Sequence, residues 1–290
     1  MFSGAIVAIV TPFKDGIVDE KAYKKLIDHV IAGGVSGIVP CGTTGESATM
    51  SHEEHKRIID LSVAEVGGRV KVIAGTGSNS TDEAISLTKH AKKAGADGVL
   101  SVVPYYNKPT PKGLFAHFEA IAKSCDIPVV LYNIPGRTGI NMPAATTIAL
   151  SKIDTIVGIK EASGDLSLAS QIIKHARGDF SVLAGDDALT LPMLSIGGKG
   201  VISVTANILP DKVAGLIKAW ESGDSAKATE MHLDLIEFHN AMFIETNPIP
   251  VKTALSLMGF INEEFRLPLC KMDTANKEKL AMALREKGCI

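Results

Sequence analysis

One lysine stands at the end of an apolar run in the stretch Ile153–Gly164, IDTIVGIKEASG. The run Thr155–Ile159 is short, rich in β-branched residues and flanked by turn-forming residues, which predicts a buried strand. Lys160 follows it directly. A lysine seldom enters a core unless it is paired or used, and burial disfavours the ammonium form. A neutral amine at this place could attack a carbonyl carbon and form a Schiff base.

The alternative for Lys160 is structural. A lysine at the end of a strand can lay its aliphatic stem along the protein and keep its ammonium group in water, which is the commoner case for an isolated Ile-Lys pair. The residues that surround Lys160 in the fold therefore have to decide between the two.

Strand-length apolar runs alternate with amphipathic, helix-length segments as far as Glu221. The predicted strands are Ala5–Val10, Gly37–Cys41, Val70–Ala74, Gly98–Val103, Pro128–Tyr132, Ile156–Ile159, Ser181–Ala184 and Gly200–Val204. The predicted helices are Asp19–Ala32, Ser51–Val66, Thr81–Ala94, Pro111–Ser124, Pro143–Leu150, Leu166–Ala176, Leu189–Ile196 and Asp211–Glu221. Eight such units predict an α/β fold in which a parallel sheet closes into a (β/α)8 TIM barrel with the helices outside.

The alternation stops after Glu221. Three further segments have helical patterns with no strand between them: Asp224–Phe243, Ile249–Phe260 and Ala275–Lys287. We therefore predict a catalytic barrel over residues 1–223 and a C-terminal helical extension over residues 224–290. Helix caps are predicted at Ser51, which forms a capping box with Glu54, and at Thr81.

Composition limits the kinds of partner. The chain has 290 residues, of which 46% are hydrophobic and 21% charged, as expected for one large globular unit or a barrel with a small addition. The net charge is −2 and no long basic run occurs, so neither a nucleic acid nor a membrane is expected as a partner. The apolar runs are too short to span a bilayer, and the N-terminal run is expected to be a strand, not a signal peptide.

The cysteines and histidines predict neither disulfides nor a metal. The four cysteines are far apart in the sequence and form no CxxC pair; they are Cys41, Cys125, Cys270 and Cys289. Free thiols favour a reducing, cytoplasmic location. The eight histidines form no HExxH motif, and no Cys/His set has the spacing of a metal site.

Active sites of (β/α)8 barrels lie where the strands end. The polar residues at the predicted strand ends are Thr11, the turn Gly42–Glu46, Thr76, Pro104–Asn107, Tyr132-Asn133, Lys160, Gly185-Asp186 and Ser203. They surround Lys160 with hydroxyl groups and offer no carboxylate ladder. Such a ring suits proton transfer and the binding of a carboxylate.

Three features of this rim have a chemical and a structural interpretation. The turn GTTGE at Gly42–Glu46 could hold a carboxylate with backbone N–H groups and threonine hydroxyls, or it could be an ordinary βα turn. Tyr132 could exchange protons near Lys160, or it could be a core tyrosine with a satisfied hydroxyl. Arg137 could bind a second carboxylate in bidentate fashion, or it could be a solvated loop residue.

The joint order of five motifs is more specific than any one of them. GTTGE, PYY, YNIPGRTG, GIKEASGD and AGDD follow one another in this chain. In this order the sequence resembles the dihydrodipicolinate synthase / N-acetylneuraminate lyase family. The resemblance runs from AIVTPF at Ala5 to NPIPVK at Asn247–Lys252, which is nearly the whole chain.

The resemblance implies a reaction and roles for its residues. The reaction is the aldol condensation of pyruvate with L-aspartate 4-semialdehyde to 4-hydroxy-tetrahydrodipicolinate, the first committed step of diaminopimelate and lysine biosynthesis. Lys160 would form the Schiff base with pyruvate, and Tyr132 would move protons. Thr43 would link Tyr132 to Tyr106 in a hydroxyl relay, with Tyr106 reaching in from a neighbouring subunit.

The remaining substrate contacts also follow from the resemblance. Thr44, with the backbone around Thr43, would bind the carboxylate of pyruvate, and Arg137 would bind that of the aldehyde. Ile202 and Gly185 would line the pocket. The family works without a metal or an organic cofactor and is usually a homotetramer built from two tight dimers.

A second site is implied for L-lysine as a feedback inhibitor at the tight-dimer interface. The matching positions are Ser47, Ala48, His52, His55, Asn79, Glu83 and Tyr105. Their chemistry fits an amino acid, because Glu83 can pair with an ammonium group and the Tyr105 hydroxyl can meet a carboxylate. The alternative is a solvated helix start, since Ser51 and Glu54 are already explained as a cap.

Two other functions remain open from the sequence. A lyase acting on sialic acid or a 2-keto-3-deoxy sugar acid would keep Lys160 and Tyr132, but such relatives generally lack the arginine found here at Arg137. A catalytically silent barrel that only binds a keto acid would not need a nucleophile together with Tyr132, Thr43 and Tyr106.

Overall fold

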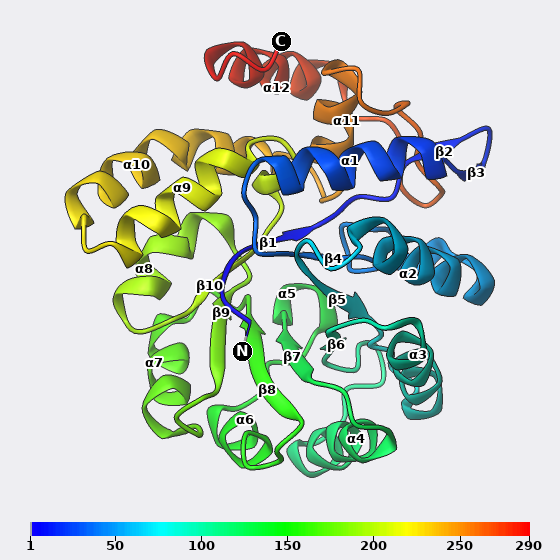
Figure 1. Ribbon diagram of the computed structural model, residues 1–290, viewed down its shortest axis with the longest axis vertical. Helices are drawn as coiled ribbons and strands as arrows, with labels where there is room; N and C mark the ends of the chain where they lie inside the picture. Colours follow the sequence, from blue (N-terminus) through cyan, green and yellow to red (C-terminus); the bar gives the residue numbers. More distant parts are fainter. Residues whose placement is uncertain (1) are drawn as a thin grey trace.

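The computed structural model describes residues 2–290, and its centre is a closed barrel of eight parallel strands (Figure 1). Strand β1 closes the barrel, because Gly4–Val7 pairs with Gly200–Ser203 on one side and Ile6–Ala8 pairs with Gly37–Val39 on the other. The barrel strands are β1 Gly4–Ala8, β4 Gly37–Val39, β5 Lys71–Gly75, β6 Gly98–Val102, β7 Val129–Asn133, β8 Ile156–Glu161, β9 Ser181–Ala184 and β10 Gly200–Ser203. The predicted (β/α)8 TIM barrel is confirmed.

Helices cover the outside of the barrel, one after each strand. They are α1 Glu20–Ala32, α2 His52–Val66, α3 Thr81–Ala94, α4 Pro111–Ser124, α6 Ala144–Leu150, α7 Leu166–His175, α8 Thr190–Ser195 and α9 Pro210–Glu221. The predicted capping box of Ser51 and Glu54 is present. The cap of α3 is Ser80, whose side chain accepts from the Glu83 N–H, and not Thr81 as predicted; Thr81 bonds to His117 instead.

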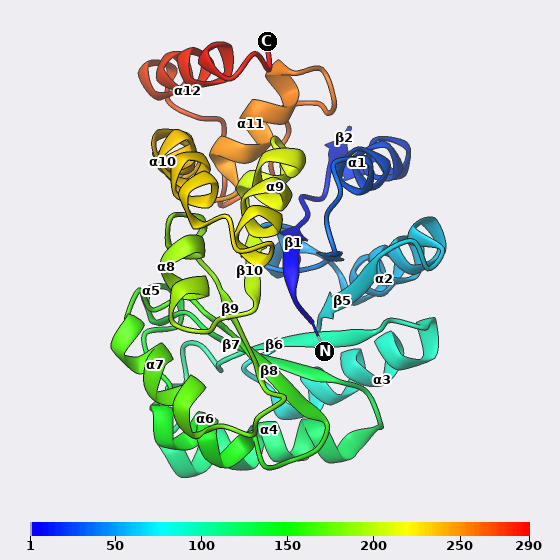
Figure 2. The same cartoon turned by 60° about the vertical axis from the view of Figure 1, so that its left-hand side comes forward.

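Three helices follow the barrel, as predicted: α10 Ser225–Ala241, α11 Ile249–Leu257 and α12 Thr274–Glu286. Figures 1 and 2 place α11 and α12 at the end of the molecule farthest from α4 and α6. Helix α10 packs along α9 and against α8, while α11 reaches the 3-10 turn η3, Thr205–Asn207, beside β10. The division of the chain at residues 223 and 224 into two domains stays a prediction.

The sequence analysis did not predict several short elements. They are the hairpin β2 Phe13–Lys14 and β3 Ile17–Val18, the helix α5 Pro135–Thr138, and the 3-10 turns η1 Ser47–Thr49, η2 Asp187–Leu189 and η3. The hairpin turn is held from the C-terminal extension, because the Glu264 carboxylate accepts from the N–H groups of Asp15, at 2.9 Å, and Gly16, at 2.6 Å. Two-residue strands carry no periodic signal, and their partner lies about 250 residues away in the chain.

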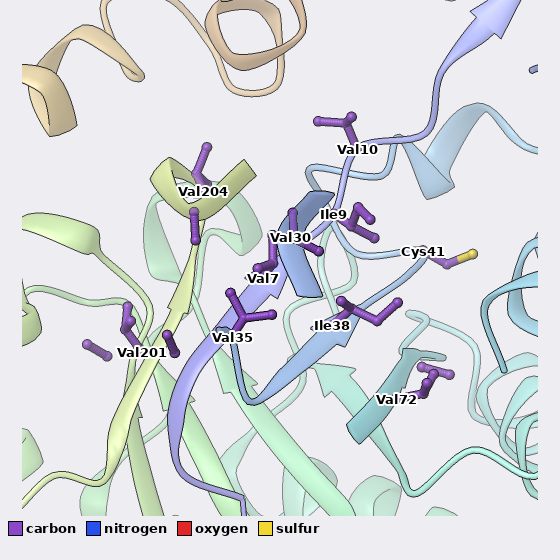
Figure 3. Close-up of a cluster of buried hydrophobic side chains, with 14 of the residues drawn as sticks. Val7, Ile9, Val10, Val30, Val35, Ile38, Cys41, Val72, Val201 and Val204 are labelled. Atoms are coloured by element: carbon purple, nitrogen blue, oxygen red, sulfur yellow. The ribbon is translucent and has the colours of Figure 1, made fainter. Parts of the chain in front are cut away.

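Two apolar layers hold the barrel together, because alternate residues of a strand point to opposite faces. In β1, Ile6 and Ala8 point into the barrel and pack with Val130, Tyr132 and Leu183 from other strands. The intervening residues point outward against the helices, and Figure 3 shows Val7, Ile38, Val72 and Val201 in this outer layer. The strands are therefore apolar on both faces, which explains the unbroken apolar runs of the sequence.

A buried histidine makes the barrel sensitive to acid. His117 on α4 is buried and its Nδ1 lies 2.9 Å from the Thr81 hydroxyl. Burial lowers the pKa of His117 to about 4, whereas a histidine in an unfolded chain ionises near 6.5. Between pH 6.5 and about 4 the unfolded chain therefore binds a proton at His117 that the folded chain does not bind. The folded state loses stability as the pH falls through this range.

His117→Leu tests this acid sensitivity. The unfolding temperature of the native sequence should fall between pH 7 and pH 4.5, with His117 contributing roughly 2 kcal/mol to the loss of stability. The variant should show a shallower fall, whatever its stability at pH 7. The exposed His175 supplies the matched control, His175→Leu. Equal slopes for His117→Leu and the native sequence would contradict the assignment.

Candidate active site

Two neighbouring strands place Lys160 beside Tyr132. Strands β7 and β8 are parallel, and their register sets Tyr132 opposite Lys160. Their neighbours Leu131 and Ile159 belong to the outer apolar layer, so Tyr132 and Lys160 point into the barrel. The Lys160 Nζ lies 4.3 Å from the centroid of the Tyr132 ring, and the lysine is only 6% exposed. The amine therefore faces an aromatic ring inside the barrel, and the alternative of a solvated strand-end lysine is wrong.

Small and apolar residues surround the stem of Lys160. Gly185, just after β9, comes close to it: a Cβ built on Gly185 would lie 3.1 Å from Lys160 Cε and 2.5 Å from Ala162 Cβ. Ile202 on β10 is buried and belongs to the same inner cluster as Tyr132. Gly185 therefore lies beside the stem of Lys160 and Ile202 lies in the cluster that contains Tyr132, while their role as pocket-lining residues stays a prediction.

The next residue on each of these two strands points outward and fixes the loops behind the site. Asn133 and Glu161 are paired in register, and the Asn133 amide donates to both oxygens of the Glu161 carboxylate, at 3.2 and 3.0 Å. The same amide donates to Asn141, and Ser163 N–H donates to Glu161 at 2.7 Å. Burial raises the pKa of Glu161 against these hydrogen bonds. The cluster ties the loops after β7 and β8 to each other.

The turn Gly42–Glu46 follows β4 and faces the C-terminal extension. The Asn247 side-chain amide donates to the Thr44 hydroxyl at 3.0 Å. Arg137 donates from Nη2 to the backbone carbonyl of Asn247, also at 3.0 Å. One residue therefore joins the two groups predicted to bind carboxylates. Because Thr44 accepts from Asn247, its own hydroxyl proton remains free to be donated to a ligand.

A single cavity of about 520 Å³ opens at this rim. Its lining includes Thr43, Tyr132, Arg137 and Asn247, but not Lys160, Thr44, Gly185 or Ile202. Tyr106 lies outside the lining and is 90% exposed, with a positive φ of 71°. Among residues 2–290, no hydrogen bond joins Thr43 to either tyrosine. Within one chain the predicted relay therefore has Tyr132 and Thr43 at the cavity, but not Tyr106.

Most of the second predicted site lines the same cavity, and we call the portion formed by these residues the outer part. Its lining includes Ser47, Ala48, His52, His55, Glu83 and Tyr105, whereas Asn79 lies outside and accepts a hydrogen bond from Asn107 on its backbone carbonyl. His52 Nε2 lies 2.8 Å from Glu83 Oε1, and the other oxygen of Glu83 accepts from Ser78. His55 is buried, and burial lowers its pKa although it donates to the Gly75 carbonyl.

Sequence analysis missed the contribution of the C-terminal extension. Asn247 and Lys252 occur in the segment NPIPVK, which served only to mark the extent of the resemblance. Lys252 forms an ion pair with Glu46 in which both side chains are almost fully buried. A lysine within an otherwise apolar helical segment was the available signal, because an unpaired lysine is seldom buried.

The fold and site together define a class of protein. A closed (β/α)8 barrel with a buried lysine beside a tyrosine at the ends of its strands is an enzyme scaffold with a candidate nucleophile. The family model described as "Dihydrodipicolinate synthetase family" matches residues 1–287. The chain belongs to this family and is a lyase.

Relatives support this assignment over the full length. The 4-hydroxy-tetrahydrodipicolinate synthase of Thermodesulfovibrio yellowstonii is 56% identical over 290 residues, which covers all of both chains. The crystal structure of dihydrodipicolinate synthase from Aquifex aeolicus has a TM-score of 0.98 and 49% identity, with 99% of each chain covered.

Two other solved relatives carry a bound small molecule. The enzyme from Cyanidioschyzon merolae has lysine bound; its TM-score is 0.97 and its identity 43%, over 100% of this chain and 99% of that one. The enzyme from Acinetobacter baumannii is complexed with pyruvate; its TM-score is 0.98 and its identity 44%, with all of both chains covered.

Proposed function

We propose that the protein condenses pyruvate with L-aspartate 4-semialdehyde to 4-hydroxy-tetrahydrodipicolinate through a Schiff base on Lys160, and so begins diaminopimelate and lysine biosynthesis. The observation that carries the proposal is the Lys160 amine, buried and 4.3 Å from the centre of the Tyr132 ring. Full-length relatives that carry the synthase name and a relative in complex with pyruvate support it.

The reaction begins with the amine. Lys160 attacks C2 of pyruvate, water leaves, and an iminium ion forms. The iminium makes the adjacent methyl group acidic, and Tyr132 helps to remove one proton, which gives an enamine. The rigid strand ends of β7 and β8 hold the two groups in place, and such positioning supplies much of the acceleration in an enzyme.

The enamine carbon then attacks the aldehyde carbon of L-aspartate 4-semialdehyde, and the aldehyde oxygen becomes a hydroxyl group. The amino group of this substrate displaces Lys160 from the imine carbon by transimination. The cyclic product leaves with the free lysine restored. Every atom of both substrates except the expelled water is accounted for, and the sequence of steps requires no cofactor.

In this proposal three groups orient the substrates. Thr44 donates its hydroxyl proton, and the backbone around Thr43 donates N–H groups, to the carboxylate of pyruvate. Arg137 uses one N–H on Asn247 and keeps the remaining N–H groups for the carboxylate of the aldehyde. A guanidinium at the cavity favours a small acidic aldehyde over a sugar acid.

Pyruvate and sodium borohydride together test the nucleophile. Borohydride should reduce the imine and leave one pyruvate-derived mass on Lys160, located by peptide mass spectrometry. Lys160→Ala should carry no label and lose condensation activity by at least about a thousandfold, because covalent catalysis is removed. The exposed Lys174 gives the control Lys174→Ala, which should be labelled normally. Label on any other lysine would refute the assignment.

We also propose that L-lysine inhibits the enzyme by binding in the outer part of the cavity. The Glu83 carboxylate offers a partner for an ammonium group, and the half-exposed Tyr105 hydroxyl offers one for a carboxylate. A relative with lysine bound supports the ligand. Because Thr43 lines the same cavity, a ligand in the outer part shares the cavity with the turn that contains Thr43.

L-lysine titration tests this second site. Activity should fall as L-lysine is raised to millimolar concentrations, and Glu83→Gln should weaken the inhibition by at least about tenfold, since a charge-assisted contact is lost. Inhibition is read within each variant as the ratio of rates with and without L-lysine. The control Glu53→Gln changes an exposed carboxylate at the start of α2. Unchanged rates at every concentration would remove the proposal.

The same enzyme is proposed to be a cytoplasmic homotetramer of two tight dimers, in which Tyr106 completes the relay of a neighbouring subunit. The free cysteines support a reducing compartment. No helix in the described part of the chain is long and apolar enough to cross a membrane. The exposed Tyr106 lies at the end of β6, outside the cavity of its own chain.

Mixed dimers test where Tyr106 acts. Lys160→Ala and Tyr106→Phe subunits should each be nearly inactive alone. Random dimers formed from equal amounts should regain about a quarter of the native activity, because half of the dimers are mixed and each mixed dimer has one complete site. No recovery in mixtures of proven composition would show that Tyr106 acts within its own chain.

A further inference from the structure

Two residues in a strained conformation enclose the turn that holds the threonines. Cys41 and Glu46 both have a φ of 55°, on either side of Gly42–Gly45. This left-handed region is uncommon for residues with a Cβ and costs free energy. Such a conformation persists only where the surroundings impose it. The contacts of Glu46 show what imposes its conformation.

A buried ion pair holds Glu46. Its Oε1 accepts from Nζ of Lys252, which comes from α11 in the C-terminal extension. The side chains are 0% exposed for Lys252 and 1% for Glu46. The same Nζ lies 4.3 Å from the ring centroid of Phe13 and 5.1 Å from that of Phe265. The ammonium group thus lies near two aromatic rings with Glu46 as its hydrogen-bonded carboxylate, while Glu264 also attracts it.

A gain in stability alone does not explain why this ion pair is buried. Removing two charges from water costs free energy that their attraction often fails to recover, so apolar residues of similar size frequently serve the core equally well. Burial lowers the pKa of Lys252, and the attraction of Glu46 only opposes that shift. The ion pair fixes the direction and distance of the Glu46 side chain, and apolar residues could not do this.

The same segment holds the turn at a second point. Asn247, five residues before Lys252, donates to the Thr44 hydroxyl. Thr44 and Glu46 are therefore both held from residues 247–252, with one glycine between them. Glu46 also lines the cavity that Thr43 lines. The extension thus holds at two points a turn that shares its cavity with Tyr132.

We propose that the Lys252–Glu46 ion pair is a positioning device that keeps the Thr43-Thr44 turn in the shape that binds the carboxylate of pyruvate. Glu46 lines the cavity, but in this proposal both residues act through the turn and not by binding the substrate. This role rests on the proposed function, because it assigns the pair to pyruvate binding in that reaction.

Removing both charges together separates positioning from stability. Single variants, Lys252→Met or Glu46→Gln, leave one buried charge or an unmatched polar group and should unfold at lower temperature. The double variant Lys252→Met/Glu46→Met is neutral and apolar, and should unfold near the native temperature. Its KM for pyruvate should nevertheless rise at least about tenfold, with a smaller change in kcat, because a misplaced turn weakens binding before chemistry.

A matched control comes from the same extension. Lys277 pairs with Glu263 at 2.7 Å in a less buried place, and neither residue lines the cavity, so Lys277→Met removes a lysine ion pair outside the site and should leave the KM for pyruvate unchanged. If the double variant does not fold, Glu46→Gln supplies the comparison, since it keeps the shape of the side chain and should raise the same KM.

The outcomes distinguish this proposal from the proposed function. The native protein is first treated with pyruvate and borohydride; absence of an adduct on Lys160 would overturn the function itself. If the adduct forms and a folded double variant, or a folded Glu46→Gln variant, has the native KM for pyruvate, the ion pair is merely structural and the positioning role is overturned. A raised KM in the presence of a normal unfolding temperature supports it.

Discussion

The register between β7 and β8 is the constraint on which the site depends. It sets Tyr132 opposite Lys160 and Asn133 opposite Glu161. Because side chains alternate along a strand, a shift of one strand by a single residue would turn the tyrosine or the lysine toward the helices. The hydrogen bonds between Asn133 and Glu161 on the outer face therefore secure the geometry of Tyr132 and Lys160 on the inner face.

The C-terminal extension is part of the site and not merely an addition to the barrel. Asn247 bonds to Thr44 and Arg137, which follow different strands, and Lys252 holds Glu46. Further along, Glu264 holds the hairpin turn after β2, and Arg266 bonds to both oxygens of Glu54. The loops at the open end of the barrel are thus fixed from one continuous stretch of chain.

The sequence predicts the barrel well because its signals are local. Each strand is a short apolar run and each helix has its own period, so the eight units could be located to within a few residues. Lys160 and Tyr132 could be placed at strand ends for the same reason. The roles of Asn247 and Lys252 could not, since their partners Thr44 and Glu46 lie about 200 residues earlier and no periodicity records such a contact. Tyr106 shows the opposite case: its role came from resemblance alone, and a single chain leaves it in solvent.

Gly185 limits how this site can diverge. A side chain at that position would collide with the stem of Lys160 and with Ala162, both on or just after β8. Even a methyl group would close the space at this position. Descendants of this sequence can therefore change which aldehyde they accept while this position stays without a side chain, so that new specificity has to arise from the surrounding loops.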